Sequence, residues 1–171
     1  MKKIYIIGNG GSGKTTLASA LAKDFSLPHL ELDDIYWDND QEKAYNIKRN
    51  FEERNALLAK FLSDHINGWV IDGVYDKEWI SQVLQQADKV VILMPCFLLT
   101  EWRCIKRDIV KIFSNKKSGS FLSLLRLLKW NVKYRYHKLP LFIKRLEEKK
   151  IKYQIIKKSK IESIKKELDL F

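Results

Sequence analysis

The stretch that decides the fold is GNGGSGKTT at residues 8–16, directly after the apolar run IYII at residues 4–7. It satisfies the pattern G-x-x-x-x-G-K-[ST] through Gly8, Gly13, Lys14 and Thr15, a spacing typical of phosphate-binding P-loops. Four of the chain's seven glycines lie in this stretch. Glycines let backbone N–H groups converge on an anion at the start of a helix. The stretch therefore predicts a strand, a phosphate-binding loop and a helix in succession.

A second pattern overlaps the first, because Gly8, Gly10 and Gly13 also fit the dinucleotide-binding sequence G-x-G-x-x-G. Acids at the end of an expected second strand follow about 20 residues later, as that alternative requires. Lys14 and Thr15 favour the P-loop, because a dinucleotide site needs neither a cation nor a hydroxyl at these positions. In a P-loop the lysine reaches the β- and γ-phosphates and the threonine hydroxyl binds Mg²⁺. A purely structural turn is a poor explanation for so many glycines.

We therefore predict that ATP and Mg²⁺ are bound by this loop. The expected nucleotide-binding residues are Gly8, Asn9, Gly10, Gly11, Ser12, Gly13, Lys14, Thr15 and Thr16.

Along the rest of the chain, short β-branched runs alternate with helical patterns, which is typical of an α/β protein with a parallel sheet. Strands are expected at 2–7, 28–33, 69–73, 89–94 and 152–156. Helices are expected at 14–24, 47–65, 76–87 with Asp76 as N-cap, 98–113, 121–149 with a restart at Pro140, and 160–170. The length favours a single domain over residues 1–171.

Two of these helices have an apolar periodicity that predicts which face packs against the core. In the helix at 47–65 the predicted face comprises Phe51, Leu57, Leu58, Phe61 and Leu62. In the helix at 98–113 it comprises Leu98, Trp102, Ile105, Ile109 and Ile112.

The net charge of +11 is unevenly distributed. Residues 1–100 carry 11 Lys and Arg against 14 Asp and Glu, whereas residues 101–171 carry 21 against 7. A basic half beside a phosphate-binding half indicates anionic partners: nucleotide, nucleic acid or an acidic lipid surface. No apolar run is long enough to span a bilayer or act as a signal peptide. With reduced thiols expected at Cys96 and Cys104, we expect a cytoplasmic protein.

Acids follow two of the expected strands. Asp72 ends the strand at 69–73, where it could hold Mg²⁺ beside Thr15; the alternative is an aspartate in a turn. Asp33 and Asp34 follow the strand at 28–33. A carboxylate at this edge could orient or deprotonate the hydroxyl of a phosphate acceptor, or it could cap a turn. Asp33 is the better candidate, because it is expected to end the strand while Asp34 begins the loop.

Arg103 and Arg107 lie four residues apart, on one face of the helix expected at 98–113. Phosphoryl transfer commonly uses an arginine on a closing lid, and we expect such a lid at about residues 103–135. The alternative is a solvated basic face paired with Glu101 or Asp108. The basic, aromatic segment 121–138 fits a lid or acceptor-site helix, a nucleic-acid surface or a membrane-surface helix.

Together, the segments GNGGSGKTTLA, LELDDIYW, WVIDGVY, EWRCIKR and KWNVKYRYHK resemble the adenylate-kinase-like family called DNA topology modulation proteins (FlaR-type). The resemblance implies a nucleotide-kinase fold with a five-stranded parallel sheet in the order 2-3-1-4-5 and a short helical lid. It implies that Asp33, Trp37, Asp72, Gly73 and Tyr75 lie at the acceptor and metal edge of the sheet. It also implies that Arg103 and Arg107 lie at the lid.

The expected function is Mg·ATP-dependent transfer of the γ-phosphoryl group to a small acceptor, for which a nucleoside or nucleotide is a candidate. Lys14, Asp33, Arg103 and Arg107 are the expected catalytic residues, and Thr15 and Asp72 the expected metal ligands. The adenine base is expected near the turn at 157–160. The alternative is an ATP-binding protein that acts on DNA topology through its basic half.

Overall fold

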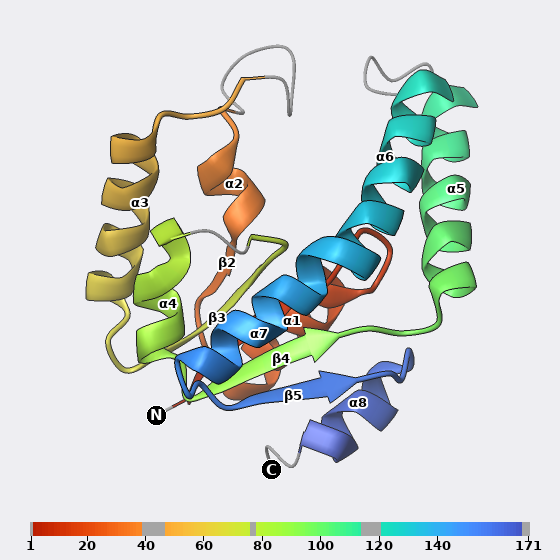
Figure 1. Ribbon diagram of the computed structural model, residues 1–171. Helices are drawn as coiled ribbons and strands as arrows, with labels where there is room; N and C mark the ends of the chain where they lie inside the picture. The colour runs from red at the N-terminus through yellow and green to blue at the C-terminus, as the bar shows by residue number, and fades with distance from the viewer. Residues whose placement is uncertain (1, 39–46, 76–77, 114–120, 169–171) are drawn as a thin grey trace.

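The computed structural model describes residues 2–38, 47–75, 78–113 and 121–168. Its strands are β1 (Lys2–Ile7), β2 (His29–Glu31), β3 (Gly68–Gly73), β4 (Lys89–Leu93) and β5 (Tyr153–Ile156). They form one five-stranded sheet in the order β2-β3-β1-β4-β5, with every pair parallel (Figure 1). The predicted fold class and strand order are confirmed.

Helices cover both faces of this sheet. They are α1 (Lys14–Phe25), α2 (Leu32–Tyr36), α3 (Phe51–Asp64), the 3₁₀ turn η1 (Glu78–Ile80), α4 (Ser81–Gln86), α5 (Phe97–Phe113), α6 (Phe121–Lys133), the π-helical turn η2 (Tyr134–Lys138), α7 (Leu139–Glu148) and α8 (Ile161–Leu168). Among the described residues, no helix is both long enough and apolar enough to span a membrane.

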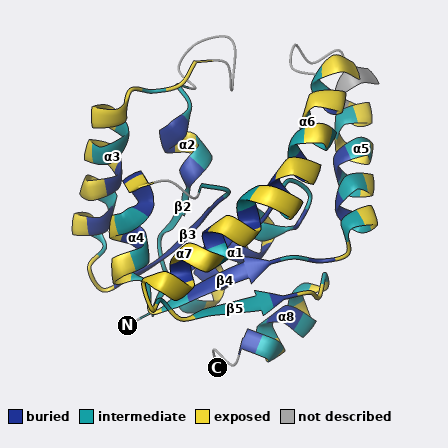
Figure 2. Cartoon of the chain, viewed as in Figure 1, coloured by how far each residue is buried: buried dark blue, intermediate teal, exposed yellow. Residues whose placement is uncertain are grey.

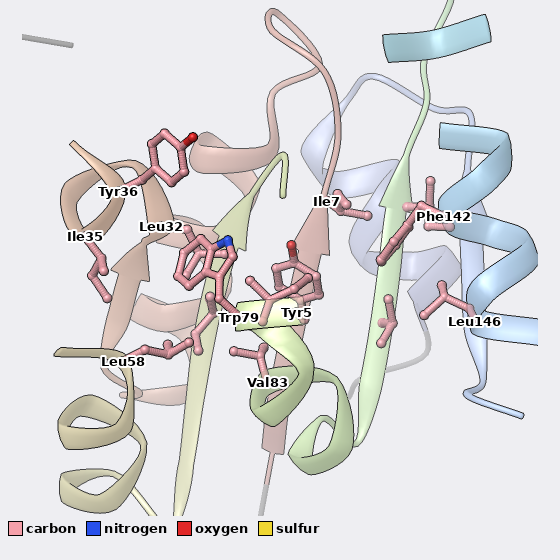
Figure 3. Close-up of a cluster of buried hydrophobic side chains, with 14 of the residues drawn as sticks. Tyr5, Ile7, Leu32, Ile35, Tyr36, Leu58, Trp79, Val83, Phe142 and Leu146 are labelled. Carbon is pink, nitrogen blue, oxygen red and sulfur yellow. The ribbon is translucent and has the colours of Figure 1, made fainter. Parts of the chain in front are cut away.

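The core has two parts, one on each face of the sheet (Figure 2). One part, shown in Figure 3, joins the sheet to α3, α4 and α7, and it includes Leu58, Val83 and Phe142. The other joins the sheet to α1 and α8, and it includes Leu17 and Ile164. Because both faces are covered, the central strands are near-continuous runs of buried apolar residues rather than alternating ones.

The register of the strands brings the predicted site residues to one edge. Ile7, the last residue before the glycine loop, pairs with Gly73, and Glu31 pairs with Asp72. In parallel sheets the carboxyl ends of the strands face the ligand crevice. The glycine loop and the ends of β2 and β3 therefore share that crevice.

Three sequence predictions need correction. The second strand ends at Glu31, and Asp33 and Asp34 lie in the first turn of α2 instead of at the strand end and in a loop. A helix N-terminus stabilises acidic side chains, which explains why this segment turns helical there. The N-cap of α4 is Ile80, and the predicted cap Asp76 lies outside the described residues.

The predicted packing faces of two helices are also partly wrong. In α3, Leu58 and Leu62 are buried, but Phe51 and Leu57 are 51% and 40% exposed. In α5, Leu98, Trp102 and Ile109 of the predicted apolar face are exposed, Trp102 by 61%. Ile105 is half-buried, and the side chain of Ile112 lies outside the part that the structure describes. Over residues 97–110 of this helix, Thr100 and Cys104 are the fully buried side chains. Both cysteines are free thiols; Cys96 lies just before α5, and Cys104 lies within it.

Candidate active site

The glycine loop adopts a conformation that requires glycine at two positions. Gly11 and Gly13 have φ angles of +73° and +90°, which side-chain-bearing residues rarely adopt. Gly13 is also the N-cap of α1, and no side chain caps that helix. The N–H groups at the start of α1 therefore remain available to an anion.

Helix α5 packs directly against the glycine loop. A Cβ atom on Gly11 would lie only 2.3 Å from the carbonyl oxygen of Thr100 and 2.9 Å from the Cys104 sulfur. The Asn9 side-chain amide, itself 4% exposed, approaches the Thr100 hydroxyl at 3.5 Å. The Asn131 side chain, from α6, would lie 3.1 Å from a Cβ on Gly10. The loop is thus packed tightly against small and polar side chains of α5 and α6.

Lys14, Thr15 and Asp72 meet at the end of β3. The Thr15 hydroxyl donates to Asp72 Oδ2 at 2.9 Å, and Lys14 Nζ lies 3.7 Å from the same oxygen. The Asp72 side chain is only 1% exposed. The structure therefore brings together the predicted phosphate-binding lysine and the two predicted metal ligands.

His29, which the sequence analysis did not single out, completes this cluster. Its Nε2 atom lies 2.8 Å from Asp72 Oδ1, and its Nδ1 atom lies 3.4 Å from the Ser19 hydroxyl. No local pattern identifies His29, because its partner Asp72 lies 43 residues away and is brought near only by the pairing of β2 with β3.

Glu31 adds a further acid to this edge. Burial, and then the nearby charges of Asp72 and Asp34, raise the pKa of Glu31 above its ordinary value. The negative charge gathered at this edge therefore favours a cation there.

Asp33 lies next to a cluster of aromatic rings. The Tyr75 hydroxyl donates to Asp33 Oδ1 at 2.6 Å, and the Tyr5 hydroxyl donates to the Tyr75 carbonyl oxygen at 3.0 Å. Burial, with the neighbouring Asp33 charge, raises the pKa of Tyr75, so this phenol remains a donor. Tyr36 stacks on Tyr75 with ring centroids 4.5 Å apart, and Trp37 meets Tyr36 edge-on at 5.0 Å.

The remaining residue predicted at this edge, Gly73, is buried at the end of β3. A Cβ atom there would lie 2.9 Å from Leu32 Cδ1 and 3.2 Å from the Tyr75 ring. Gly73 thus allows α2 and the segment after β3 to approach each other closely.

A cavity of about 380 Å³ opens over the glycine loop. It is lined by Asn9 and the residues from Gly11 to Thr16, by Arg103 and Arg107 of α5, and by Ser159 and residues of α8. Arg103 Nη1 lies 3.5 Å from the Gly11 carbonyl oxygen, whereas Arg107 Nε pairs with Asp108 at 3.3 Å. Both predicted arginines therefore reach the cavity, together with the turn at 157–160 where the base was predicted.

The residues present fit a nucleotide-bound magnesium ion better than a metal held by protein alone. The described residues contain no group of three or more His, Cys, Asp or Glu side chains that could hold a metal ion. Mg²⁺ usually keeps several waters and binds one or two protein oxygens together with phosphate oxygens. The Thr15 hydroxyl and Asp72 carboxylate offer that oxygen chemistry beside the loop.

The strand order and the glycine loop define the class of the chain as a P-loop α/β protein. A shikimate kinase from Acinetobacter baumannii, solved in complex with shikimate, superposes with a TM-score of 0.61 at 18% identity, over 99% of this chain and 92% of that one. A gluconokinase from Sinorhizobium meliloti 1021 aligns with a TM-score of 0.48 at 18% identity, over 78% of this chain and 74% of that one.

In sequence, the chain is 35% identical over 92 residues to a Bacillus subtilis protein described as uncharacterized protein YqaC. The match covers 54% of this chain, and it spans about half the length of that protein, 48%. No protein-family model matches the chain. These comparisons give no support to membership of the topology modulation family or to a nucleic-acid partner, and both stay predictions.

Proposed function

We propose that the protein is a kinase that transfers the γ-phosphoryl group of Mg·ATP to a hydroxyl of a small acceptor. One observation carries this proposal: Lys14, Thr15 and Asp72 converge within 3.7 Å at the mouth of the loop, while Asp33 lies beyond the adjacent strand end. The phosphate-binding group and the candidate base thus lie at the same edge of the sheet. The superposition on a shikimate kinase supports the fold that such chemistry uses.

In this mechanism the loop N–H groups and Lys14 bind the β- and γ-phosphates. Thr15 and Asp72 would hold Mg²⁺, which when bound neutralises charge on the phosphates. His29 engages Asp72 Oδ1, so that Oδ2 is directed towards Thr15 and Lys14. Arg103 and Arg107, which line the same cavity, would stabilise negative charge on the transferred group.

Asp33 is the proposed base for the acceptor hydroxyl. Tyr75 fixes the carboxylate by donating to Oδ1, and Oδ2 accepts no hydrogen bond from the described residues. The second oxygen is therefore available to accept the proton of an acceptor hydroxyl as the phosphoryl group is transferred. Trp37 and Gly73 would line the acceptor side of the same edge. We place the enzyme in the cytoplasm, with both cysteines reduced.

The test is ADP release from Mg·ATP in the presence of nucleosides, nucleoside monophosphates, hydroxylated metabolites and duplex DNA. Strong stimulation by one small acceptor, lost in Lys14→Ala, supports the kinase and identifies its substrate. Stimulation by duplex DNA alone, with steep salt dependence, would overturn the small-molecule assignment. The full-length Lys60→Gln variant, altered on the exposed face of α3, serves as a control with the same loss of charge.

A further inference from the structure

A second cavity, of about 580 Å³, lies on the face of the sheet covered by α3, α4 and α7. The side chains of Phe51 and Arg54 line it from α3, Glu78 and Trp79 from η1, and Phe142 and Arg145 from α7. Figure 3 shows Trp79 and Phe142 on this face, with Tyr5 between them. The cavity combines aromatic walls with cationic side chains, and it is separate from the glycine-loop cavity.

Arg54 is the best-defined cation of this cavity. Its guanidinium lies 4.6 Å from the centroid of the Tyr36 ring and 5.6 Å from that of Trp79. Its Nε atom donates to the Asn50 carbonyl oxygen at 3.1 Å, at the capped start of α3. No described carboxylate pairs with it. The side chain is thus half-buried and fixed by aromatic rings, with its terminal N–H groups uncommitted among the described residues.

The rest of the lining favours an anion with an apolar or cyclic body. Arg145 and Lys149 add positive charge, against one acid, Glu78. Trp79 is only 4% exposed, and its indole Nε1 has no hydrogen-bond partner among the described residues. That indole N–H is itself buried, so the Arg54 guanidinium is the group that matches an oxyanion such as a carboxylate or phosphate.

The cavity lies one layer of aromatic rings from the proposed base. Trp79 meets Tyr75 at a centroid distance of 5.2 Å, and the Tyr75 hydroxyl contacts Asp33 at 2.6 Å. Tyr36 contacts both rings, at 4.5 Å from Tyr75 and 6.2 Å from Trp79. The ring cluster thus lies between Arg54 and Asp33, and a ligand that contacts both must extend along the edge of these rings.

We propose that the Arg54 cavity binds the anionic group of the phosphate acceptor, which makes the acceptor class a hydroxylated carboxylate or a phosphate monoester. The identification of this ligand as the substrate rests on the proposed kinase function. The guanidinium supplies charge-assisted hydrogen bonds to the oxyanion, and the rings of Trp79 and Phe51 contact the body of the molecule.

Matched pairs of anionic and neutral probes test the proposal. We would titrate quinate against its methyl ester, glucose 6-phosphate against glucose, and cytidine monophosphate against cytidine. Binding is followed by calorimetry with the glycine loop saturated by Mg²⁺ and a non-hydrolysable ATP analogue, so that probes cannot bind there. The variants are Arg54→Gln, Arg54→Lys and the control Lys60→Gln, which removes the same charge from an exposed position of α3.

We expect at least one anionic probe to bind about 10- to 100-fold more tightly than its neutral partner. Arg54→Gln should abolish that difference, Arg54→Lys should retain part of it, and Lys60→Gln should leave it unchanged. The carboxylate and phosphate pairs identify which oxyanion is bound. Equal binding of both members of every pair, or equal effects of Arg54→Gln and Lys60→Gln, would overturn the proposal.

The same variants and probes show whether the anion site or the kinase function fails, because each predicts a different result. Arg54-dependent, anion-selective binding without ADP release from any probe would refute the kinase and leave the anion site in place. ADP release with no preference for anionic acceptors would refute the anion site and leave the kinase in place. If Arg54→Gln fails to fold, as judged by its unfolding transition, Arg54→Lys and the probe pairs on the unaltered protein still decide the question.

Discussion

Gly11→Ala tests whether α5 determines the shape of the phosphate-binding loop. Gly11 has a φ of +73°, and an added Cβ would lie 2.3 Å from the backbone oxygen of Thr100. A backbone atom cannot rotate away, so either the loop or α5 must move. The Gly11→Ala substitution would be destabilising both through its left-handed backbone conformation and through its contact with Thr100, and the neighbouring loop glycines separate these two effects. Gly13 has a φ of +90° but open space, with Arg103 Nη1 nearest at 3.7 Å, whereas Gly10 meets only side chains.

The expected free-energy costs follow from these differences. A left-handed backbone conformation costs a residue other than glycine about 1–2 kcal/mol. Overpacking adds about 1–3 kcal/mol, so Gly11→Ala should reduce the free energy of unfolding by about 2–5 kcal/mol. Gly13→Ala carries only the backbone cost of about 1–2 kcal/mol. Gly10→Ala, at 3.1 Å from Asn131 Oδ1 and without the unfavourable φ, should cost less than either.

Urea unfolding of the three variants without nucleotide measures this order, and titration with Mg·ADP measures the loss of binding. We expect the stability losses to rank Gly11→Ala, then Gly13→Ala, then Gly10→Ala. Gly11→Ala should also weaken nucleotide binding most, because its loop can no longer rest against Thr100. A Gly11→Ala protein as stable as Gly10→Ala would refute the packing between the loop and α5.

Three further predictions concern the acids of the sheet edge. Asp33→Asn should lower kcat by about 10²- to 10⁴-fold with an unchanged Kd for Mg·ADP. Tyr75→Phe should lower kcat less. Steady-state rates measure kcat for both variants, and calorimetry measures the Kd. His29→Leu leaves Asp72 Oδ1 without its partner, so Mg²⁺-dependent nucleotide binding should weaken by about 1–3 kcal/mol, with partial rescue by His29→Gln, as measured by Mg²⁺ titration. Glu31→Gln should raise the free energy of unfolding at pH 7, because the raised pKa shows that the folded state disfavours the ionised carboxyl. That gain should vanish in urea unfolding below the ordinary pKa of 4.5, where the folded and unfolded chains both hold the protonated form.

The sheet and the phosphate-binding loop could be predicted because their signals are local. The glycine spacing, the strand before Gly8 and the strand that contains Asp72 can each be recognised from a few consecutive residues. His29 could not be found this way, because its role depends on which strand lies beside β2. The end of the second strand was placed too late, because apolar alternation in residues 28–33 does not reveal that α2 begins at Leu32.

The second cavity was missed for a similar reason. Arg54 lies in the middle of an otherwise ordinary amphipathic helix, and only its contacts with rings from α2 and η1 distinguish it from a solvated arginine. Such contacts join segments that are 18 and 25 residues away along the chain. The apolar periodicity of α3 therefore gives no sign of these contacts.

Helix α5 shows why apolar periodicity gave the wrong packing face. The predicted face ran through Leu98 and Trp102, yet the helix packs against a glycine loop whose backbone approaches within van der Waals contact. Only small side chains fit there, and Thr100 and Cys104 supply them. Arg103 and Arg107 follow these residues at spacings of three, so all four positions fall along one side of the helix. The side that supports the loop is therefore continuous with the side that brings both arginines to its cavity. A single requirement, close approach of α5 to the loop, thus positions two cations over the phosphate-binding residues.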